Sequence, residues 1–189
     1  MNRLAVFLAV AVMLTFGQSA FASDQRLTIS TNNTPLDRAV LTEVATAAFG
    51  QLGYEIEMVS LPSERSLRSA NAGEVDGEGL RVAGLAERYP NLVQIPEKFT
   101  SIRFVAFASD PEIEIRDWSS LADYRVAFIT GWKMVEKHAS GAKSVVKVDD
   151  AEQMFRMLEA GRIDLVLYTE ADGDVFLNTH DMPEISMLP

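Results

Sequence analysis

The sequence contains no cysteine, and only 2 of its 189 residues are histidine. Without cysteine, disulfide bonds, thiol catalysis and cysteine-ligated metals are excluded. His138 and His180 lie far apart in the sequence and match no metal-binding spacing, and no nucleophile motif such as G-x-S-x-G accompanies them. We therefore expect a protein that is not an enzyme and that uses no metal or cofactor.

Clusters of positive charge and long apolar runs are also scarce. The formal net charge is −10, with 17 Lys and Arg residues against 27 Asp and Glu residues. Because binding to nucleic-acid phosphates requires clustered cations, we expect no nucleic-acid partner. Beyond residue 22, no apolar segment approaches the roughly 20 residues that span a bilayer. Membrane insertion of the mature chain is therefore not expected.

The first 22 residues have the three parts of a cleavable signal peptide. Arg3 supplies a positive charge, residues 4–16 form an uncharged apolar run, and Ala20-Phe21-Ala22 fits an A-x-A cleavage site. The pattern predicts cleavage after Ala22 and a periplasmic location for the remaining 167 residues. An uncleaved membrane anchor is the alternative, whereas a lipid anchor would need a cysteine.

Strand-like and helix-like patterns alternate along the chain, which is typical of an α/β fold with a largely parallel sheet. Strands are predicted where apolar residues alternate or run together, and helices where apolar residues recur on one face after a capping residue. The predicted strands are residues 27–31, 54–59, 103–108, 124–129, 145–148 and 163–168, with a short one from Val75. The predicted helices are residues 35–52, 64–72, 151–160 and a segment from Trp132 to about His138.

Residues 70–76 and 158–164 share one pattern of helix end, glycine, polar residue, β-branched residue and aspartate. Two lobes built on one plan would produce such an echo. Other short motifs occur with them in a fixed order. The motifs are Gly53-Tyr54, Pro62-x-x-Arg65, Gly73-x-Val75-Asp76-Gly77, Trp118-x-x-Leu121 and Gly161-Arg162-Ile163-Asp164.

This order resembles the extracytoplasmic solute-binding proteins of family 3, the polar amino-acid receptors of ABC transporters, from Leu27 to about Tyr168. The resemblance implies a type II periplasmic-binding-protein fold, in which two α/β lobes joined by a hinge close on a ligand in a cleft. Lobe 1 would be residues 23–106, and the hinge and lobe 2 would be residues 107–189. The family adds helices that return to lobe 1, and this sequence stops at Met187-Leu188-Pro189, where that return would begin. We therefore expect a fragment or a shortened homologue that lacks the C-terminal part of lobe 1.

The function implied by the resemblance is capture of a small polar, carboxylate-bearing, amino-acid-like solute for an ABC transporter, with an inner-membrane permease as partner. Two alternatives stay open. One is a sensory or accessory module of the same fold that presents the solute to a sensor protein. The other is a degenerate homologue that binds nothing.

Two arginines are candidates for gripping a ligand carboxylate, since a planar guanidinium can do so with two hydrogen bonds. In the family, the gripping arginine ends a Glu-Arg pair twelve residues after an aspartate, and Asp76 and Glu87-Arg88 reproduce that spacing. Residues 77–82 depart from the family pattern, so Arg88 could instead lie on a solvated loop. Arg81 with Glu78 is the alternative ligand pair, or else an internal ion pair.

Further candidates come from the second half of the chain. Thr130-Gly131-Trp132 precedes a predicted helix, so its backbone amides could bind an anionic group, and Trp132 could stack on the ligand or belong to the core. The resemblance places the aspartate that binds the ligand amine at Thr169, where Glu170 or Asp172 could substitute. Arg65 would line the cleft or remain a surface charge.

Overall fold

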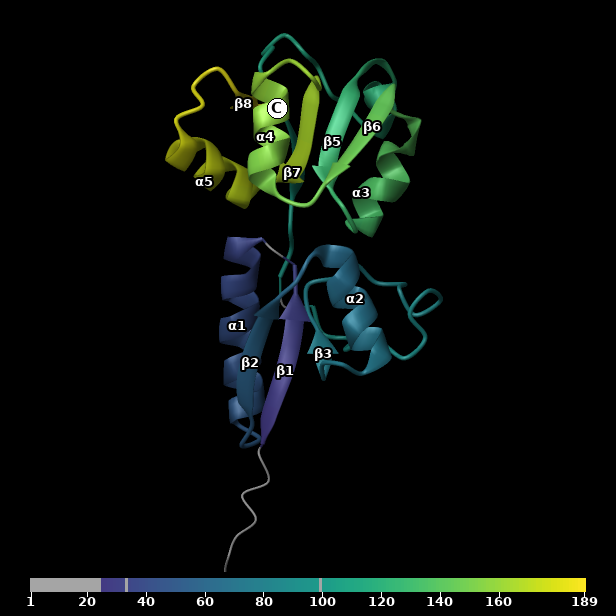
Figure 1. Cartoon of the computed structure of the whole chain (residues 1–189), viewed down its shortest axis with the longest axis vertical. Coiled ribbons are helices and arrows are strands. Elements are labelled where there is room, and N and C mark those ends of the chain that lie inside the picture. Colours follow the sequence, from purple (N-terminus) through teal and green to yellow (C-terminus); the bar gives the residue numbers. More distant parts are fainter. Residues whose placement is uncertain (1–24, 33, 99) are drawn as a thin grey trace, which may run out of the picture.

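The computed structural model describes residues 25–32, 34–98 and 100–189, which form two α/β lobes (Figure 1). The predicted signal peptide lies outside the described residues. The two lobes confirm the fold class expected from the sequence. Among the described helices, none combines the length and the apolar content needed to cross a bilayer.

Lobe 1 is built on a small parallel sheet with the strand order β2-β1-β3. Helix α1 packs on β2, and α2 packs on β1 and β3. The core is small: Leu41 and Ala45 of α1 are buried against Ile29 of β1. The elements of lobe 1 are β1 (Arg26–Thr31), α1 (Pro35–Gly50), β2 (Glu55–Ser60), α2 (Ser63–Ala72) and β3 (Gly77–Glu78).

The helix ends of lobe 1 follow local chemistry, with small shifts from the predicted positions. Pro35 starts α1 because its fixed φ suits the first helical position. Gly73 ends α2 in the left-handed conformation, at φ +74°. Thr34 stands at the capping position before α1 but makes no side-chain capping bond, because its hydroxyl contacts the side chain of Asn32 instead. The third strand is Gly77–Glu78 rather than a strand starting at Val75.

Lobe 2 contains a five-stranded mixed sheet in the order β6-β5-β7-β4-β8. Strand β5 pairs in parallel with β6 and β7, whereas β4 runs antiparallel to β7 and β8. The sheet is therefore only partly parallel. The elements of lobe 2 are β4 (Phe104–Ala108), η1 (Trp118–Asp123), β5 (Arg125–Ile129), α3 (Lys133–His138), η2 (Ala139–Gly141), β6 (Ser144–Val148), α4 (Ala151–Glu159), β7 (Leu165–Thr169), α5 (Glu170–His180) and β8 (Ser186–Met187).

The core of lobe 2 is much larger than that of lobe 1. Met154, Phe155 and Leu158 form the buried face of α4, three or four positions apart as on one side of a helix. The ring of Phe155 meets Phe107 of β4 edge-on, with ring centroids 5.4 Å apart. All five residues of β7 are buried, which fits a central strand covered on both faces.

The two lobes face each other through the carboxyl ends of their parallel strands (Figure 1). β1 points toward lobe 2, while β5 and β7 point toward lobe 1. Within the described residues, the chain passes between the two sheets once, in the segment between β3 and β4. The proposed lobe boundary after Ala106 falls inside β4, which pairs with β7 from Phe104 to Phe107. This arrangement brings the residues after β1, β5 and β7 to one region, the lobe junction.

Candidate functional site

The lobes meet on the α2 side of the junction through a glycine. Gly131, directly after β5, lies so close to the start of α2 that an added Cβ would be 2.6 Å from the backbone nitrogen of Glu64 and 2.8 Å from Cβ of Ser63. Its φ of +87° is also one that favours glycine. The absence of a side chain therefore allows the two lobes to make backbone-level contact here.

An ion-pair network spans the same side of the junction. The Lys133 ammonium of α3 pairs with Glu64 of α2, across the two lobes. Glu64 also accepts hydrogen bonds from the Tyr89 hydroxyl at 3.0 Å and from Nε of Arg68 at 3.2 Å. Although burial raises the pKa of Glu64, these partners outweigh it and the pKa falls below the ordinary value. Glu64 is therefore charged at neutral pH.

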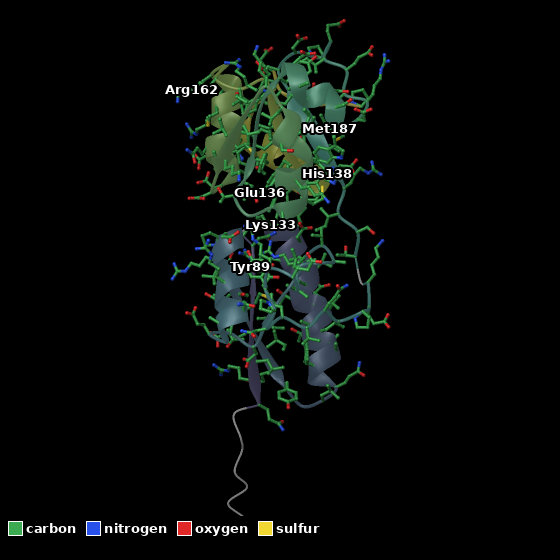
Figure 2. All side chains as sticks on the ribbon, turned by 90° about the vertical axis from the view of Figure 1, so that its right-hand side faces the viewer. Tyr89, Lys133, Glu136, His138, Arg162 and Met187 are labelled. Atoms are coloured by element: carbon green, nitrogen blue, oxygen red, sulfur yellow. The ribbon has the colours of Figure 1, made fainter. Side chains whose placement is uncertain are left out.

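Glu136 of α3 completes this network within lobe 2. Its carboxylate accepts the Gly131 N–H at 3.1 Å and lies 3.5 Å from Nζ of Lys133 and 3.3 Å from Nζ of Lys147. Burial raises the pKa of Glu136, but the hydrogen bond from Gly131 and the two lysines lower it by more than burial raises it. The pKa therefore falls below the ordinary value. Figure 2 shows Lys133 and Glu136 at the edge of lobe 2 that faces lobe 1.

A second contact joins the lobes on the α1 side of the junction. The backbone N–H of Leu36, in the first turn of α1, donates to Oδ1 of Asp172 at 3.1 Å. Asp172 is buried, and its Oδ2 accepts the Thr169 hydroxyl at 3.0 Å. Burial and the nearby Asp172 charge raise the pKa of Asp37 to about 6. The first turn of α1 thus carries a carboxyl group of raised pKa close to the buried Asp172 of lobe 2.

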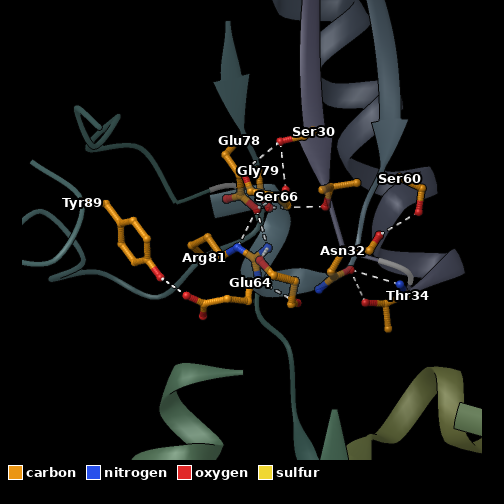
Figure 3. Close-up of polar contacts among 12 residues, drawn as sticks. Ser30, Asn32, Thr34, Ser60, Glu64, Ser66, Glu78, Gly79, Arg81 and Tyr89 are labelled. Atoms are coloured by element: carbon orange, nitrogen blue, oxygen red, sulfur yellow. Dashed lines mark hydrogen bonds and ion pairs between the residues drawn. The ribbon is translucent and has the colours of Figure 1, made fainter. Parts of the chain in front are cut away.

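Arg81 and Glu78 form the internal ion pair that was one of their two predicted roles. Their charged atoms are 2.5 Å apart (Figure 3), and the side chains are 14% and 3% exposed. The terminal nitrogens of Arg81 also donate to the hydroxyl and the carbonyl oxygen of Ser63, each at 3.1 Å. Ser66 lies 3.0 Å from the Glu78 carboxylate. Burial raises the pKa of Glu78 more than Arg81 lowers it. The arginine therefore braces the start of α2, and a ligand role for it stays a prediction.

The other predicted arginines are not gathered with this group. Arg88 is exposed and belongs to a turn in which its backbone N–H donates to Leu85. Arg65 is exposed on α2. Their ligand roles also remain predictions.

The amides of Thr130-Gly131-Trp132, predicted to bind an anion, have partners within lobe 2. The Thr130 N–H donates to the Val148 carbonyl at 2.7 Å, and the Trp132 N–H donates to the Ile129 carbonyl at 3.3 Å. The Gly131 N–H donates to the Glu136 carboxylate. These backbone groups are thus satisfied without a ligand.

Trp132 is packed in the core of lobe 2, which was one of its two predicted roles, and a ligand role for it stays a prediction. It is 6% exposed and stacks on Tyr168 with ring centroids 5.3 Å apart. Its Nε1 is buried and finds no hydrogen-bond partner among the described residues. Thr169 is buried at the end of β7, and its hydroxyl donates to Asp172, one of the two residues named as possible substitutes for it.

Sequence reasoning missed Glu64, Lys133 and Glu136. Glu64 and Lys133 are 69 positions apart, so no local pattern relates them. A weak signal for two of these residues was present in the sequence. Glu64 follows Ser63 and Lys133 follows Trp132, so each stands at the start of a predicted helix that also carries or follows a candidate ligand residue.

Two surface hollows lie on lobe 2, away from this junction. One, of about 450 Å³, includes Arg125 and Asp164 at the starts of β5 and β7. The other, of about 240 Å³, lies along β4 and η1. Neither is lined by a predicted ligand residue.

Comparison with solved structures identifies the fold. An ancestral arginine-binding protein bound to glutamine superposes with a TM-score of 0.70 at 17% identity, over 87% of this chain and 78% of that one. A Gly52Ala mutant of arginine-bound ArgBP from T. maritima gives 0.69 at 18% identity, over 86% and 81%. The amino acid ABC transporter substrate-binding protein AbpA from Streptococcus pneumoniae, bound to L-arginine, gives 0.69 at 16% identity, over 88% and 76%.

Sequence comparison is less informative. The chain matches no protein-family model. It is 26% identical over 141 residues to an uncharacterized protein from Shewanella oneidensis, covering 72% of this chain. The aligned part spans about half, 53%, of that relative's length. The chain thus has the two-lobed fold of amino-acid-binding proteins of ABC transporters.

Proposed function

We propose that this chain is a periplasmic solute-binding protein that captures a small polar solute, carboxylate-bearing and amino-acid-like, for an ABC transporter. The observation that carries the proposal is the lobe junction, where charged side chains of both lobes meet at the carboxyl ends of their sheets. Ligands of open α/β sheets bind at such strand ends. The amino-acid ligands named for the structural neighbours support the same solute class.

Arg81 is the first residue to test for the ligand carboxylate. It is largely buried and stands at the lobe junction, whereas Arg88 is exposed. A ligand carboxylate would take the place of Ser63 as the partner of the two terminal Arg81 nitrogens. Trp132 and Tyr168 would then form the aromatic wall on the lobe 2 side.

The test is a binding screen on the mature protein, with thermal shift followed by calorimetry. The panel contains L-arginine, L-glutamine, dicarboxylates and polyamines. A true ligand at 100 times its Kd should stabilise the protein by about 2.7 kcal/mol. A folded protein that binds no member of the panel would favour the degenerate homologue.

Two variants identify the arginine that holds the ligand. Arg81→Ala should weaken binding at least about tenfold, the equivalent of about 1.4 kcal/mol, because a charge-assisted pair of hydrogen bonds is lost. Arg88→Ala is made in parallel, and Arg162→Ala is the matched control, an exposed arginine of lobe 2. If neither Arg81→Ala nor Arg88→Ala weakens binding, the carboxylate site is elsewhere.

Transport and sensing are separated by the genes that lie beside this one. Permease and ATPase genes would indicate uptake. A signalling gene alone would indicate the sensory module.

A further inference from the structure

The first turn of α3 carries an ammonium and a carboxylate side by side. Nζ of Lys133 lies 3.5 Å from Oε2 of Glu136, and the two side chains are only 15% and 18% exposed. Both face lobe 1 at the junction (Figure 2). Opposite charges held this close resemble the two ends of a zwitterionic solute.

The carboxylate of this pair occupies the anion position at the end of β5. The Gly131 N–H, one of the amides predicted to bind a ligand anion, donates to Glu136 at 3.1 Å. Lys147 adds a second positive partner at 3.3 Å. The position is therefore filled by the protein's own carboxylate.

The ammonium occupies a cation position on the opposite lobe. Lys133 pairs with Glu64 at the start of α2, and the Glu64 side chain is 24% exposed. Tyr89 and Arg68 hold the same carboxylate from lobe 1. Two of the Glu64 contacts thus come from its own lobe and do not depend on Lys133, as expected of a preorganised cation site.

The ion pair spans the lobes where they are already in contact. The backbone at Gly131 leaves no room for even a methyl group against Ser63 and Glu64. An ion pair formed only when the lobes touch stabilises the closed state over the open one, since its energy is absent once they part.

We propose that Glu64 is a subsite for the cationic group of the solute and that Lys133 is a tethered competitor, which occupies it and holds the lobes closed without ligand. A solute with an ammonium or guanidinium group enters by displacing Lys133 from Glu64. The competitor role rests on the proposed function, whereas closure by Lys133 does not. Solutes without a cationic group cannot replace the lysine and are disfavoured.

Closure is tested by an interlobe distance in ligand-free protein. The absence of cysteine permits spin labels at Gln51→Cys on lobe 1 and Glu159→Cys on lobe 2, both exposed and away from the junction. Lys133→Met should lengthen or broaden the distance, while Lys137→Met, the same change on an exposed lysine of α3, should leave it unchanged. An unchanged distance in Lys133→Met overturns the proposal.

A second variant guards against misfolding of the first. Glu64→Gln removes the other half of the pair and should also lengthen the distance. Closure of both single variants would likewise refute the role of the pair.

Competition is tested with L-arginine as the probe. Removal of the tethered cation in Lys133→Met should tighten arginine binding by about tenfold, and Lys137→Met should not. Equal affinity of wild type and Lys133→Met overturns the competitor role and leaves solute binding intact. If no compound of the screen binds wild type or Lys133→Met, the proposed solute binding and the competitor role are both wrong. The interlobe distance in ligand-free protein then tests only the closure by Lys133.

Discussion

At the scale of single residues, the junction places two carboxylates of opposite behaviour at the edges of lobe 1. Glu64 has charged and hydrogen-bonding partners that keep its pKa low. Asp37 is half-buried near Asp172 and has its pKa raised to about 6. Glu64 therefore stabilises the folded, closed molecule when it is charged, whereas Asp37 destabilises it when charged.

Asp37 predicts a pH dependence of stability. Because its folded-state pKa is raised, the folded protein binds this proton more tightly than the unfolded chain, so the contribution to stability falls as the pH rises from about 4 to about 6. Asp37→Asn should remove this loss and, allowing for solvent screening, raise the free energy of unfolding at pH 7 by about 1 kcal/mol. Denaturant melts at pH 4 and pH 7 measure it.

The control for this prediction is Asp174→Asn, an exposed aspartate on α5. It should leave the pH profile of wild type unchanged. A profile for Asp37→Asn as steep as that of wild type would contradict the prediction.

At the scale of elements, the two aspartates of the repeated motif make the same contact in each lobe. We call it a bracket: the aspartate exchanges two hydrogen bonds with the backbone of one strand residue, one through its side chain and one through its own N–H. Asp76 accepts the Thr28 N–H at 2.8 Å, and its own N–H donates to the Thr28 carbonyl at 2.9 Å. Asp164 makes the equivalent pair with Arg125, at 2.7 and 2.8 Å. Each aspartate lies in the turn after a helix and joins that turn to the backbone of a neighbouring strand, so the echo in the sequence reflects a shared structure.

Loss of the lobe 2 bracket should destabilise the protein. Asp164→Ala removes hydrogen bonds from the Arg125 backbone and from its guanidinium, the closest at 2.6 Å. Because the pair is partly exposed, we expect a loss of about 1–2 kcal/mol in urea unfolding at neutral pH. Glu159→Ala, on an exposed residue nearby, should change it little.

The same bracket has a pH signature. Hydrogen bonds and the charge of Arg125 lower the pKa of Asp164, so its contribution is present above the ordinary carboxyl range and lost as the pH falls through the lowered value. The difference in free energy of unfolding between wild type and Asp164→Ala should therefore become smaller as the pH falls. A difference that does not change with pH would show that the substitution removes packing and not a charge interaction.

Much of the element order could be predicted from sequence, because local patterns decide it. Helix α4 is an example, because residues close together in the sequence determine both its apolar face and its start. It begins after Asp150, whose side chain accepts the Gln153 N–H at 2.8 Å. Helix α5 was not predicted, since it buries only Asp172 and Gly173 and lacks a clear apolar face. The antiparallel direction of β4 was missed because strand patterns do not reveal direction.

The candidate site was less predictable than the fold. Arg81 and Glu78 are three positions apart, so their pairing could be proposed in advance. The Glu64–Lys133 pair depends on how two separately folded lobes meet, which no window of sequence contains. The sequence around Trp132 was compatible with core or with ligand surface, and its burial against Tyr168 could not be predicted from it.

At the scale of the whole molecule, contact between the lobes depends on the missing side chain at Gly131. Gly131→Ala should keep the lobes apart, because its Cβ would lie 2.6 Å from the Glu64 backbone. Small-angle scattering of ligand-free protein should then give a larger radius of gyration. Solute affinity should fall about tenfold or more, because the added Cβ also blocks closure of the lobes around a bound solute.

Gly161→Ala is the matched control for this substitution. Its φ of +63° imposes similar backbone strain, but nothing lies within 4 Å of the added Cβ. Scattering should remain that of wild type, with only a small loss of stability. If both variants expand equally, strain rather than the lobe contact explains the effect.

The unequal cores of the two lobes have a consequence for the order in which the molecule opens. Lobe 2 buries Phe107, Phe128 and Phe155 completely within one large cluster, whereas the hydrophobic cluster of lobe 1 has only Ile29, Leu41 and Ala45 as buried members. The other buried apolar side chains described in lobe 1 are Leu67, Ala70 and Tyr89. Regions with few buried contacts open at lower free energy than the densely packed ones. Backbone amides of β1 and β2 should exchange with deuterium well before those of β5 and β7, which makes lobe 2 the platform and lobe 1 the adaptable half.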